Sequence, residues 1–436
     1  MRVFRTDCRE WQGYKPCGKQ KLGLVEGCEN CHLYAPIQEN VLIVEAGGLG
    51  SALRTSVVAK EIRRRSPNAR IQWLTSEQSI ELVEKNIPSV DRAYPTTWES
   101  LMILGAQAYN QIINFESNSL HLAFVGDLLL KKRGFAMNEL GNLVQASRSA
   151  EEFLWLQTND RFRRRENKKS MQQVLLEAVG LEWREQPYDL ATRPEDNRWA
   201  QAFLESRGIV ETDGLIGLNI GSSQRHSAKR WPPRYFYELA KLCQEHHPEW
   251  KLLVLAGLED VDAYEVISGL NKIEPLGNLI FMGYGNTMSQ FISLVDRIPL
   301  VISADTFGLH VALGLGKKAI SLWGPQPENE TYGYGRERKI SLGLDCAPCF
   351  AGRTEKCTNP NTLQCMREIR VLMVYQILEQ ELSQGGVAFG LGAVIQLPRL
   401  FFFRNSEKRG GVNFMSFERG SSSIRSSRTL TLCPLG

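Results

Sequence analysis

Short apolar runs alternate with amphipathic stretches through most of the chain. The first runs, at residues 41–44, 71–75 and 112–115, are separated by segments with helical spacing. A second series follows at residues 215–220, 252–256, 279–282, 300–303 and 319–323. Buried strands that alternate with helices are typical of a parallel sheet with helices on both faces. The pattern therefore predicts an α/β chain with two doubly wound, Rossmann-like domains facing a cleft.

The segments around these two series differ in composition. Residues 1–38 are polar and turn-rich, which predicts a Cys-rich N-terminal appendage. The two α/β domains are expected at residues 39–212 and 213–383, with a mostly helical, charged stretch at about 125–212. Residues 384–436 are rich in Gly, Ser and Arg without a sustained period, and this composition favours disorder.

Composition and charge narrow the functional class. Of 436 residues, 43% are hydrophobic and 23% charged, as in soluble globular proteins. No apolar run reaches the roughly 18 residues of a membrane span, and the first residues lack the apolar core of a secretory signal, so we expect a cytoplasmic protein. The net charge of +4 comes from the segment after residue 383, with seven Lys or Arg and two Asp or Glu. Nucleic-acid binding is therefore not expected.

A glycine-rich turn, GGLG at residues 47–50, follows the first apolar run. It leads into a helix that we expect to begin at Ser51, a good N-cap residue, and to end near Arg65. Glycines allow the backbone to approach a ligand closely, and the first N–H groups of a helix bind anions or sugar hydroxyls. The full GxGxxG fingerprint of dehydrogenases is absent. Gly48 and Gly50 are predicted ligand contacts, with a tight turn without a ligand as the alternative.

A second motif, NIGSSQRHSAKRWPP, occupies residues 219–233. Small hydroxyl residues at the end of an expected strand are followed by a cationic loop. A diphosphate requires positive charge together with hydrogen-bond donors, which Ser222, Ser223 and Lys229 can supply. The alternative is a solvated basic loop.

A third motif, SADTFGLH, occupies residues 303–310 between a buried strand and a helix. Asp305 and Thr306 stand where a helix N-terminus holds phosphate oxygens. His310 lies four residues after Thr306 and therefore shares a helix face with it. A single histidine or a single Asp-Thr pair is usually structural, but three such loops at strand ends indicate a ligand site.

These motifs together resemble glycosyltransferase family 9, whose best-known members are the ADP-heptose:lipopolysaccharide heptosyltransferases. The similarity covers about residues 40–380. It consists of an opening strand and LGD-type loop, a K-x-W-P segment, an acidic segment that contacts the nucleoside, a D-T-G-x-x-H signature and an F-G-P-T segment. In this chain the matching segments are residues 41–54, 222–232, 255–259, 305–310 and 322–325.

The resemblance implies a GT-B fold, with the acceptor on the N-terminal domain and the nucleotide sugar on the C-terminal domain. It also implies inversion at the anomeric carbon without a catalytic metal. ADP-heptose is the implied donor, and the implied acceptor is a lipopolysaccharide-type glycolipid, reached by peripheral contact with the inner membrane. Lys229 resembles the lysine that neutralises the leaving diphosphate, and Glu259 resembles the ribose ligand. The diphosphate and sugar contacts implied by the signature are Asp305, Thr306, Gly308 and His310.

The chain departs from the family pattern at a catalytic position. Family members usually carry Asp directly after the glycine turn, where it is proposed as the general base, but this chain has Ser51. A serine hydroxyl cannot act as a base near neutral pH without help. We therefore expect Glu116, just past the third apolar run, to take the proton, with Glu45 as the alternative. A nucleotide-sugar-binding protein with weak or no transferase activity also stays open.

Eight of the ten cysteines fall into two groups of four, each with one CxxC pair. Disulfides are disfavoured in the cytoplasm, and four thiols suit a tetrahedral Zn²⁺ or an Fe–S cluster. We expect structural metal sites, with unmetallated thiols as the alternative, and a metal-bearing interaction module as a further reading of the whole chain. The groups are Cys8, Cys17, Cys28 and Cys31, and Cys346, Cys349, Cys357 and Cys365.

Overall fold

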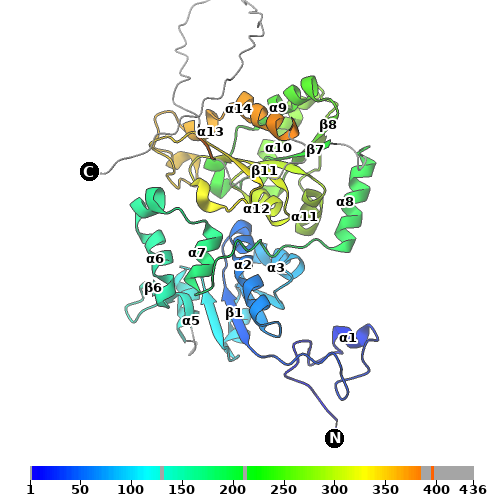
Figure 1. Ribbon diagram of the computed structural model, residues 1–436, viewed down its shortest axis with the longest axis vertical. Helices are drawn as coiled ribbons and strands as arrows, with labels where there is room; N and C mark the ends of the chain where they lie inside the picture. The colour runs from blue at the N-terminus through cyan, green and yellow to red at the C-terminus, as the bar shows by residue number, and fades with distance from the viewer. Residues whose placement is uncertain (1, 128–131, 210–213, 384–393, 397–436) are drawn as a thin grey trace, which may run out of the picture. The chain divides into compact units, whose positions relative to one another are not determined.

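A computed structural model describes residues 2–127, 132–209, 214–383 and 394–396 (Figure 1). The first sheet has the strand order β3-β2-β1-β4-β5-β6 and is parallel except for the β5–β6 pair. Its strands are β1 (Asn40–Val44), β2 (Arg70–Thr75), β3 (Arg92–Pro95), β4 (Gln111–Asn114), β5 (Lys132–Met137) and β6 (Leu143–Gln145). The helices of this half include α2 (Leu49–Arg65), α3 (Ile80–Asn86), α4 (Trp98–Gly105), α5 (Ser119–Asp127), α6 (Glu151–Thr158) and α7 (Met171–Ala178).

The second sheet has the order β13-β12-β11-β10-β7-β8-β9, with every pairing parallel. Its strands are β7 (Gly214–Asn219), β8 (Trp250–Leu255), β9 (Leu279–Phe281), β10 (Leu300–Ala304), β11 (Lys318–Trp323), β12 (Glu337–Ser341) and β13 (Val394–Gln396). The helices of this half include α8 (Pro194–Ser206), α9 (Pro233–His246), α10 (Val261–Ile273), α11 (Met288–Asp296), α12 (Phe307–Gly314) and α14 (Val371–Ser383).

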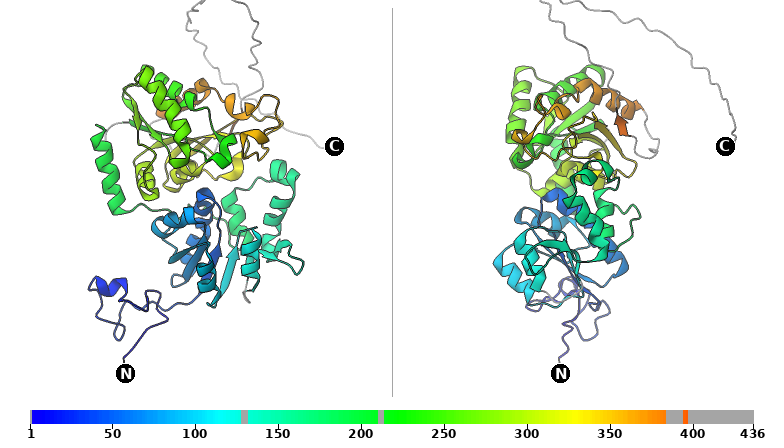
Figure 2. Two further views of the ribbon diagram at one scale, coloured as in Figure 1. Left: turned by 180° about the vertical axis from the view of Figure 1, so that it is seen from behind. Right: turned by 90° about the vertical axis from the view of Figure 1, so that its left-hand side faces the viewer.

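Helices cover both faces of each sheet (Figure 2), because successive strand residues point to opposite sides. In β8, Leu252 and Val254 pack in the core that α9, α10 and α14 complete, whereas Leu253 and Leu255 pack with α11 and α12. The central strands β1, β8, β10 and β11 are mostly apolar, as expected for parallel sheets that are buried on both faces. The prediction of two doubly wound sheets is confirmed.

Two local predictions were wrong. Helix α2 begins at Leu49, with Gly48 as its N-cap, so Ser51 lies inside the first turn and caps nothing. The stretch expected to be mostly helical also contains β5, which begins with the polar residues Lys132 and Arg133, and β6, which has only three residues. The expected disorder of residues 384–436 lies outside the described residues, apart from strand β13.

The two halves contact each other through helices, since α2 packs against α12 and α3 against α11. The N-terminal appendage contains a short helix, α1 (Gly18–Lys21), and a bridge between Cys8 and Pro36. Among the described residues, no helix is both long and apolar enough to cross a membrane.

Candidate active site

The second and third sequence motifs form one site at the amino end of α12. The Nζ atom of Lys229 lies 2.6 Å from Oδ2 of Asp305. Asp305 is only 5% exposed and directly precedes Thr306, the N-cap of α12. The structure therefore brings the predicted phosphate-binding lysine to the D-T segment, 76 positions away in the sequence.

The charges of this site are set by burial and by its cationic side chains. Burial by itself would raise the pKa of Asp305, but the cationic surroundings, Lys229 above all, hold it at about 2. Burial lowers the pKa of His310 to about 3, assisted by the nearby charge of Arg54. Near neutral pH the site therefore presents one carboxylate, one ammonium group, one guanidinium group and a neutral imidazole.

The start of α12 is held in place by Asn219 at the end of β7. Its side-chain amide donates to Oγ1 of Thr306 at 2.7 Å and to Oγ of Ser303 at 2.8 Å. Gly308 leaves room for this amide, because a Cβ atom at residue 308 would lie 2.5 Å from Cγ of Asn219. The predicted sugar contact Gly308 thus also has a packing role.

Asp260, which the sequence analysis missed, joins two loops of the second half. Its carboxylate accepts hydrogen bonds from the backbone N–H groups of Ser222 and Gly257, both at 2.9 Å. The hydroxyl of Ser222 donates to the carbonyl of His226 at 2.6 Å. Both donors of Ser222 are therefore used within the loop, which supports the loop's shape. In the sequence, the one signal for this role was that Asp260 is a second acidic residue directly after Glu259.

Ser223 and Glu259, the two other residues predicted on these loops, are less buried than Ser222 and Asp260. Ser223 stands at the N-cap of a short 3-10 helix (Gln224–Lys229) that ends at Lys229. Glu259 is exposed, and its backbone carbonyl accepts a hydrogen bond from Arg230 at 3.1 Å. Its carboxylate is therefore accessible to a ligand, as the predicted ribose contact requires.

The glycine turn of the first half reaches the same site. A Cβ atom on Gly50 would lie 3.1 Å from Cδ2 of His310. The hydroxyl of Ser51 accepts a hydrogen bond from Arg54 at 3.2 Å, and Arg54 also pairs with Glu330 at 2.6 Å. The amino-terminal turns of α2 and α12, one from each half, thus lie next to each other.

Two contacts at this site could not be predicted from the sequence. Arg54 and Glu330 are 276 positions apart, and the hydroxyl of Tyr188 contacts Nδ1 of His310 at 3.1 Å across 122 positions. Neither pair belongs to a motif with a recognisable spacing.

Comparison with known proteins identifies this arrangement. The sequence model of glycosyltransferase family 9 (heptosyltransferase) matches residues 104–359, more than half of the chain. The chain belongs to glycosyltransferase family 9. This family assignment confirms the resemblance predicted from the sequence motifs.

Two relatives of this family 9 glycosyltransferase have low sequence identity to it, but the similarity extends over about two thirds of this chain. The lipopolysaccharide core heptosyltransferase OpsX of Haemophilus influenzae is 20% identical over 295 residues, covering 67% of this chain and 80% of that protein. Lipopolysaccharide heptosyltransferase 1 of Campylobacter coli is 22% identical over 303 residues, covering 66% and 84%. The structure of Escherichia coli ADP-heptose lps heptosyltransferase II is similar with a TM-score of 0.58, at 15% identity over 80% of this chain and 100% of that chain. The predicted GT-B fold is therefore confirmed.

Both predicted candidates for the general base lie beside the glycine turn of the family 9 fold. Glu116 accepts a hydrogen bond from the backbone N–H of Ala46 at 2.7 Å. Glu45 accepts one from the N–H of Gly47 at 2.9 Å. Burial raises the pKa of Glu45 to about 8, and the neighbouring charge of Glu116 adds to this shift.

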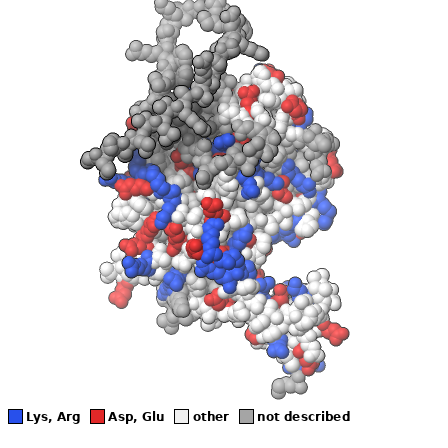
Figure 3. Space-filling view, in the orientation of Figure 1, with Lys and Arg blue, Asp and Glu red and all other residues white. Residues whose placement is uncertain are grey.

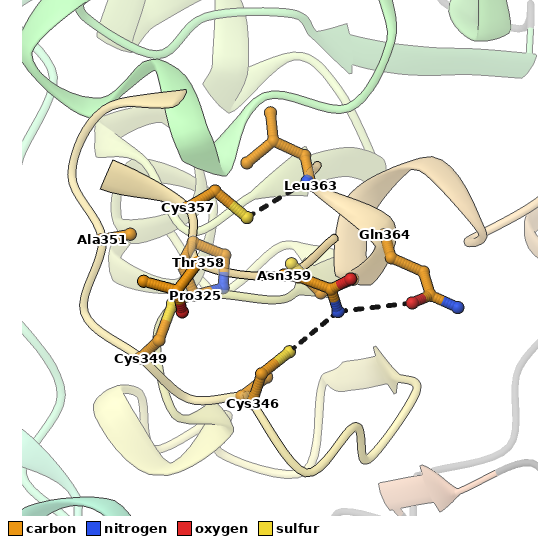
Figure 4. A pocket seen from close by; sticks show the side chains of 11 residues that line it. Pro325, Cys346, Cys349, Ala351, Cys357, Thr358, Asn359, Leu363 and Gln364 are labelled. Carbon is orange, nitrogen blue, oxygen red and sulfur yellow. Dashed lines mark hydrogen bonds between the residues drawn. The ribbon is translucent and has the colours of Figure 1, made fainter. Parts of the chain in front are cut away.

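The four cysteines of the C-terminal group line one pocket together with Pro325 (Figure 4). The side-chain amide of Asn359 donates to the sulfur of Cys346 at 3.2 Å, and the N–H of Leu363 donates to that of Cys357 at 3.3 Å. Two further sulfurs, of Cys349 and Cys365, complete the group. The structure therefore places these four cysteines around one pocket.

In the described part of the structure, the thiols of neither cysteine group converge on one point as the ligands of a metal ion would. Within the described ranges, no three His, Cys, Asp or Glu side chains converge closely enough to hold a metal ion. The N-terminal group, Cys8, Cys17, Cys28 and Cys31, consists of free, half-buried thiols. The metal prediction for both groups therefore stays a prediction.

Proposed function

We propose that this family 9 enzyme transfers heptose from ADP-heptose to a lipopolysaccharide-type glycolipid acceptor, with inversion at the anomeric carbon. The observation that carries the proposal is the buried pair of Lys229 and Asp305 at the amino end of α12. A helix N-terminus and an ammonium group together suit a diphosphate, and the adjacent α2 turn brings the first half to the same place.

The proposed reaction is a direct displacement. An acceptor hydroxyl loses its proton and attacks the anomeric carbon, while the bond from that carbon to the diphosphate oxygen breaks and its electron pair leaves with ADP. Lys229 and the N–H groups at the start of α12 stabilise the charge on the departing diphosphate. We propose that Asp305 and the neutral His310 exchange hydrogen bonds with sugar hydroxyls. Glu259 would bind the ribose.

The turn with Gly48 and Gly50 would admit the acceptor close to the backbone of α2. Ser223 and Thr306 are proposed as further contacts of the donor's phosphates. Because the acceptor is a glycolipid, we propose that the chain acts in the cytoplasm, in peripheral contact with the inner membrane. On the face seen in Figure 3, basic residues gather in groups among acidic ones, which favours such local contacts over a continuous nucleic-acid surface.

A panel of nucleoside diphosphates tests the donor site. We expect ADP to raise the thermal unfolding midpoint of the purified chain clearly more than UDP or GDP at equal concentration, because a bound ligand stabilises the folded state. A response to ADP without any sugar transfer would favour a nucleotide-sugar-binding protein. No response to any nucleotide would favour an interaction module and contradict the proposal.

We also propose that each cysteine group holds a structural metal ion, Zn²⁺ or iron. Burial raises the pKa of Cys365 to about 12, and the three other sulfurs of its group contribute. A cation that balances the charge of the Cys365 thiolate would favour its deprotonation. The two N–H donors to sulfur in this pocket suit thiolates. A bound metal would fix the loop beside Pro325 and supply no step of the transfer.

Elemental analysis of protein purified without chelator should find about two metal equivalents per chain, one for each four-thiol group. Cys357→Ser should remove about one equivalent. Cys243→Ser, in the core of α9 outside both groups, should leave the metal content unchanged. A metal-free chain in which all eight grouped thiols react freely in the native state would reject the proposal.

A further inference from the structure

A transferase of this kind needs a proton acceptor, and few carboxylates near the α2 and α12 turns are available. Asp305 is paired with Lys229 and Glu330 with Arg54, both at 2.6 Å. A carboxylate held in such a pair is a weak base, since the cation stabilises its ionised form. Of the carboxyl groups that interact with Arg54 or Glu45 in the described part of the chain, Glu45 and Glu116 remain.

Glu45 lies next to Ser51, across the space that Gly47 leaves empty. A Cβ atom built on Gly47 would lie 2.6 Å from Oε1 of Glu45 and 3.3 Å from Oγ of Ser51. The carboxyl group and the hydroxyl therefore both lie on the side of Gly47 where a Cβ atom would stand. Any side chain at residue 47 would force the Glu45 carboxyl away.

Several polar atoms of the first half are buried without a hydrogen-bond partner among the described residues. They are Oε2 of Glu45, Nε of Arg54, Oγ1 of Thr75 and Nδ1 of His121. Glu45 and Thr75 lie at the carboxyl ends of β1 and β2, Arg54 lies on α2, and His121 lies on α5. The N–H of Glu45 donates to Leu74, directly before Thr75, and His121 lies 3.9 Å from Glu116.

Unsatisfied buried polar atoms are costly, and a native site retains them where a ligand supplies the partner. Glu45 is only 5% exposed, and its buried Oε2 atom accepts no hydrogen bond from the described residues. An acceptor hydroxyl of the incoming sugar chain is a donor of the required kind.

We propose that Glu45 is the catalytic base of this enzyme and that Glu116 is a positioning residue that acts through it. In the step, a carboxylate oxygen of Glu45 takes the proton of the acceptor hydroxyl. The hydroxyl oxygen bonds to the anomeric carbon, and the leaving nucleoside diphosphate departs with the electron pair of the broken bond. This inference rests on the proposed transferase function.

The charges around Glu45 agree with this geometry. The charged and titratable groups that face Glu45 are Glu116, after β4, and Arg54, on α2, with His121 of α5 against Glu116. Burial and Glu116 together hold the pKa of Glu45 at about 8. A base must be ionised to act, so turnover should rise with pH through this value.

The decisive variant is Glu45→Gln, which keeps the shape of the side chain. With ADP-heptose and lipopolysaccharide lacking core heptose as substrates, we expect turnover to fall about a hundred- to ten-thousandfold. The affinity for ADP should not change, because the lysine site is untouched. Glu84→Gln, at an exposed carboxylate on α3, is the matched control and should keep full activity.

Two further variants separate a catalytic role from a structural one. Adding Ser51→Asp to Glu45→Gln places a carboxylate on the other side of the Gly47 space and should restore about tenfold or more of the lost turnover. Glu116→Gln should keep most of the turnover but move the alkaline rise of the pH profile to lower pH, because a like charge is removed. If instead Glu116→Gln abolishes turnover and Glu45→Gln does not, Glu116 is the base and the inference is wrong.

A measurement without turnover distinguishes this inference from the proposed function. Infrared spectroscopy of the full chain follows the C=O band of protonated carboxyl groups from neutral to alkaline pH. We expect one such band to disappear near pH 8 in the wild type and to be absent from Glu45→Gln. A chain with this band but no transfer would count against the proposed function alone. A wild type without the band would contradict the assignment of Glu45.

Discussion

Lys229→Met should weaken ADP binding by about ten- to a hundredfold. Lys229 is the one ammonium group within contact of Asp305 in the part of the chain that the structure describes, and its side chain is only 16% exposed. Removing a charge-assisted contact to a phosphate costs about 1.5–3 kcal/mol, and each 1.4 kcal/mol corresponds to roughly a factor of ten. Calorimetric titration with ADP measures the change directly.

Two controls show whether this loss reflects the nucleotide site. Lys229→Arg keeps the positive charge and should recover part of the affinity. Lys241→Met removes an exposed lysine that pairs with Glu274 on the surface of α9 and should leave ADP binding unchanged. Equal ADP affinity in Lys229→Met and the wild type would remove Lys229 from the diphosphate site.

Gly308→Ala should lower both the stability of the chain and its affinity for ADP. The added Cβ would lie 2.5–2.7 Å from three side-chain atoms of Asn219, which is buried and bonded to Ser303 and Thr306. The amide has no room to move without losing these hydrogen bonds. Overpacking of this kind costs about 1–3 kcal/mol, and the displaced start of α12 would carry Asp305 with it.

Thermal unfolding and calorimetry of the same protein measure the two effects. Gly269→Ala is the matched control, because residue 269 lies within helix α10 and a Cβ there meets no atom within 4 Å. An alanine in that helix should stabilise by up to about 1 kcal/mol. If Gly308→Ala unfolds at the wild-type temperature and binds ADP normally, the close packing against Asn219 does not shape the site.

The strands and the donor loops could be predicted because they depend on local sequence. Strands β1, β7 and β10 are continuous apolar runs, and each is followed by small or polar residues that mark its carboxyl end. Parallel sheets gather such ends at one edge. The meeting of Lys229 and Asp305 therefore follows from topology as well as from resemblance.

The contacts between the two halves could not be predicted in the same way. The ion pair joins Arg54 on α2 to Glu330, which lies after β11 in the second half, and no spacing in the sequence encodes this contact. The start of α2 was misplaced because Ser51 is a good N-cap residue, whereas the chain uses Gly48. The raised pKa of Glu45 is also a tertiary effect, since burial and Glu116, 71 positions away, produce it.

The most direct test of the account is acceptor-dependent release of ADP from ADP-heptose by the purified full chain. With lipopolysaccharide lacking core heptose present, we predict steady release of ADP and a heptose-bearing product of inverted anomeric configuration. Without the acceptor, or with UDP- or GDP-linked sugars, release should be far slower. Donor turnover that is equally slow with and without acceptor, for all three nucleotides, would contradict the assignment as a heptosyltransferase.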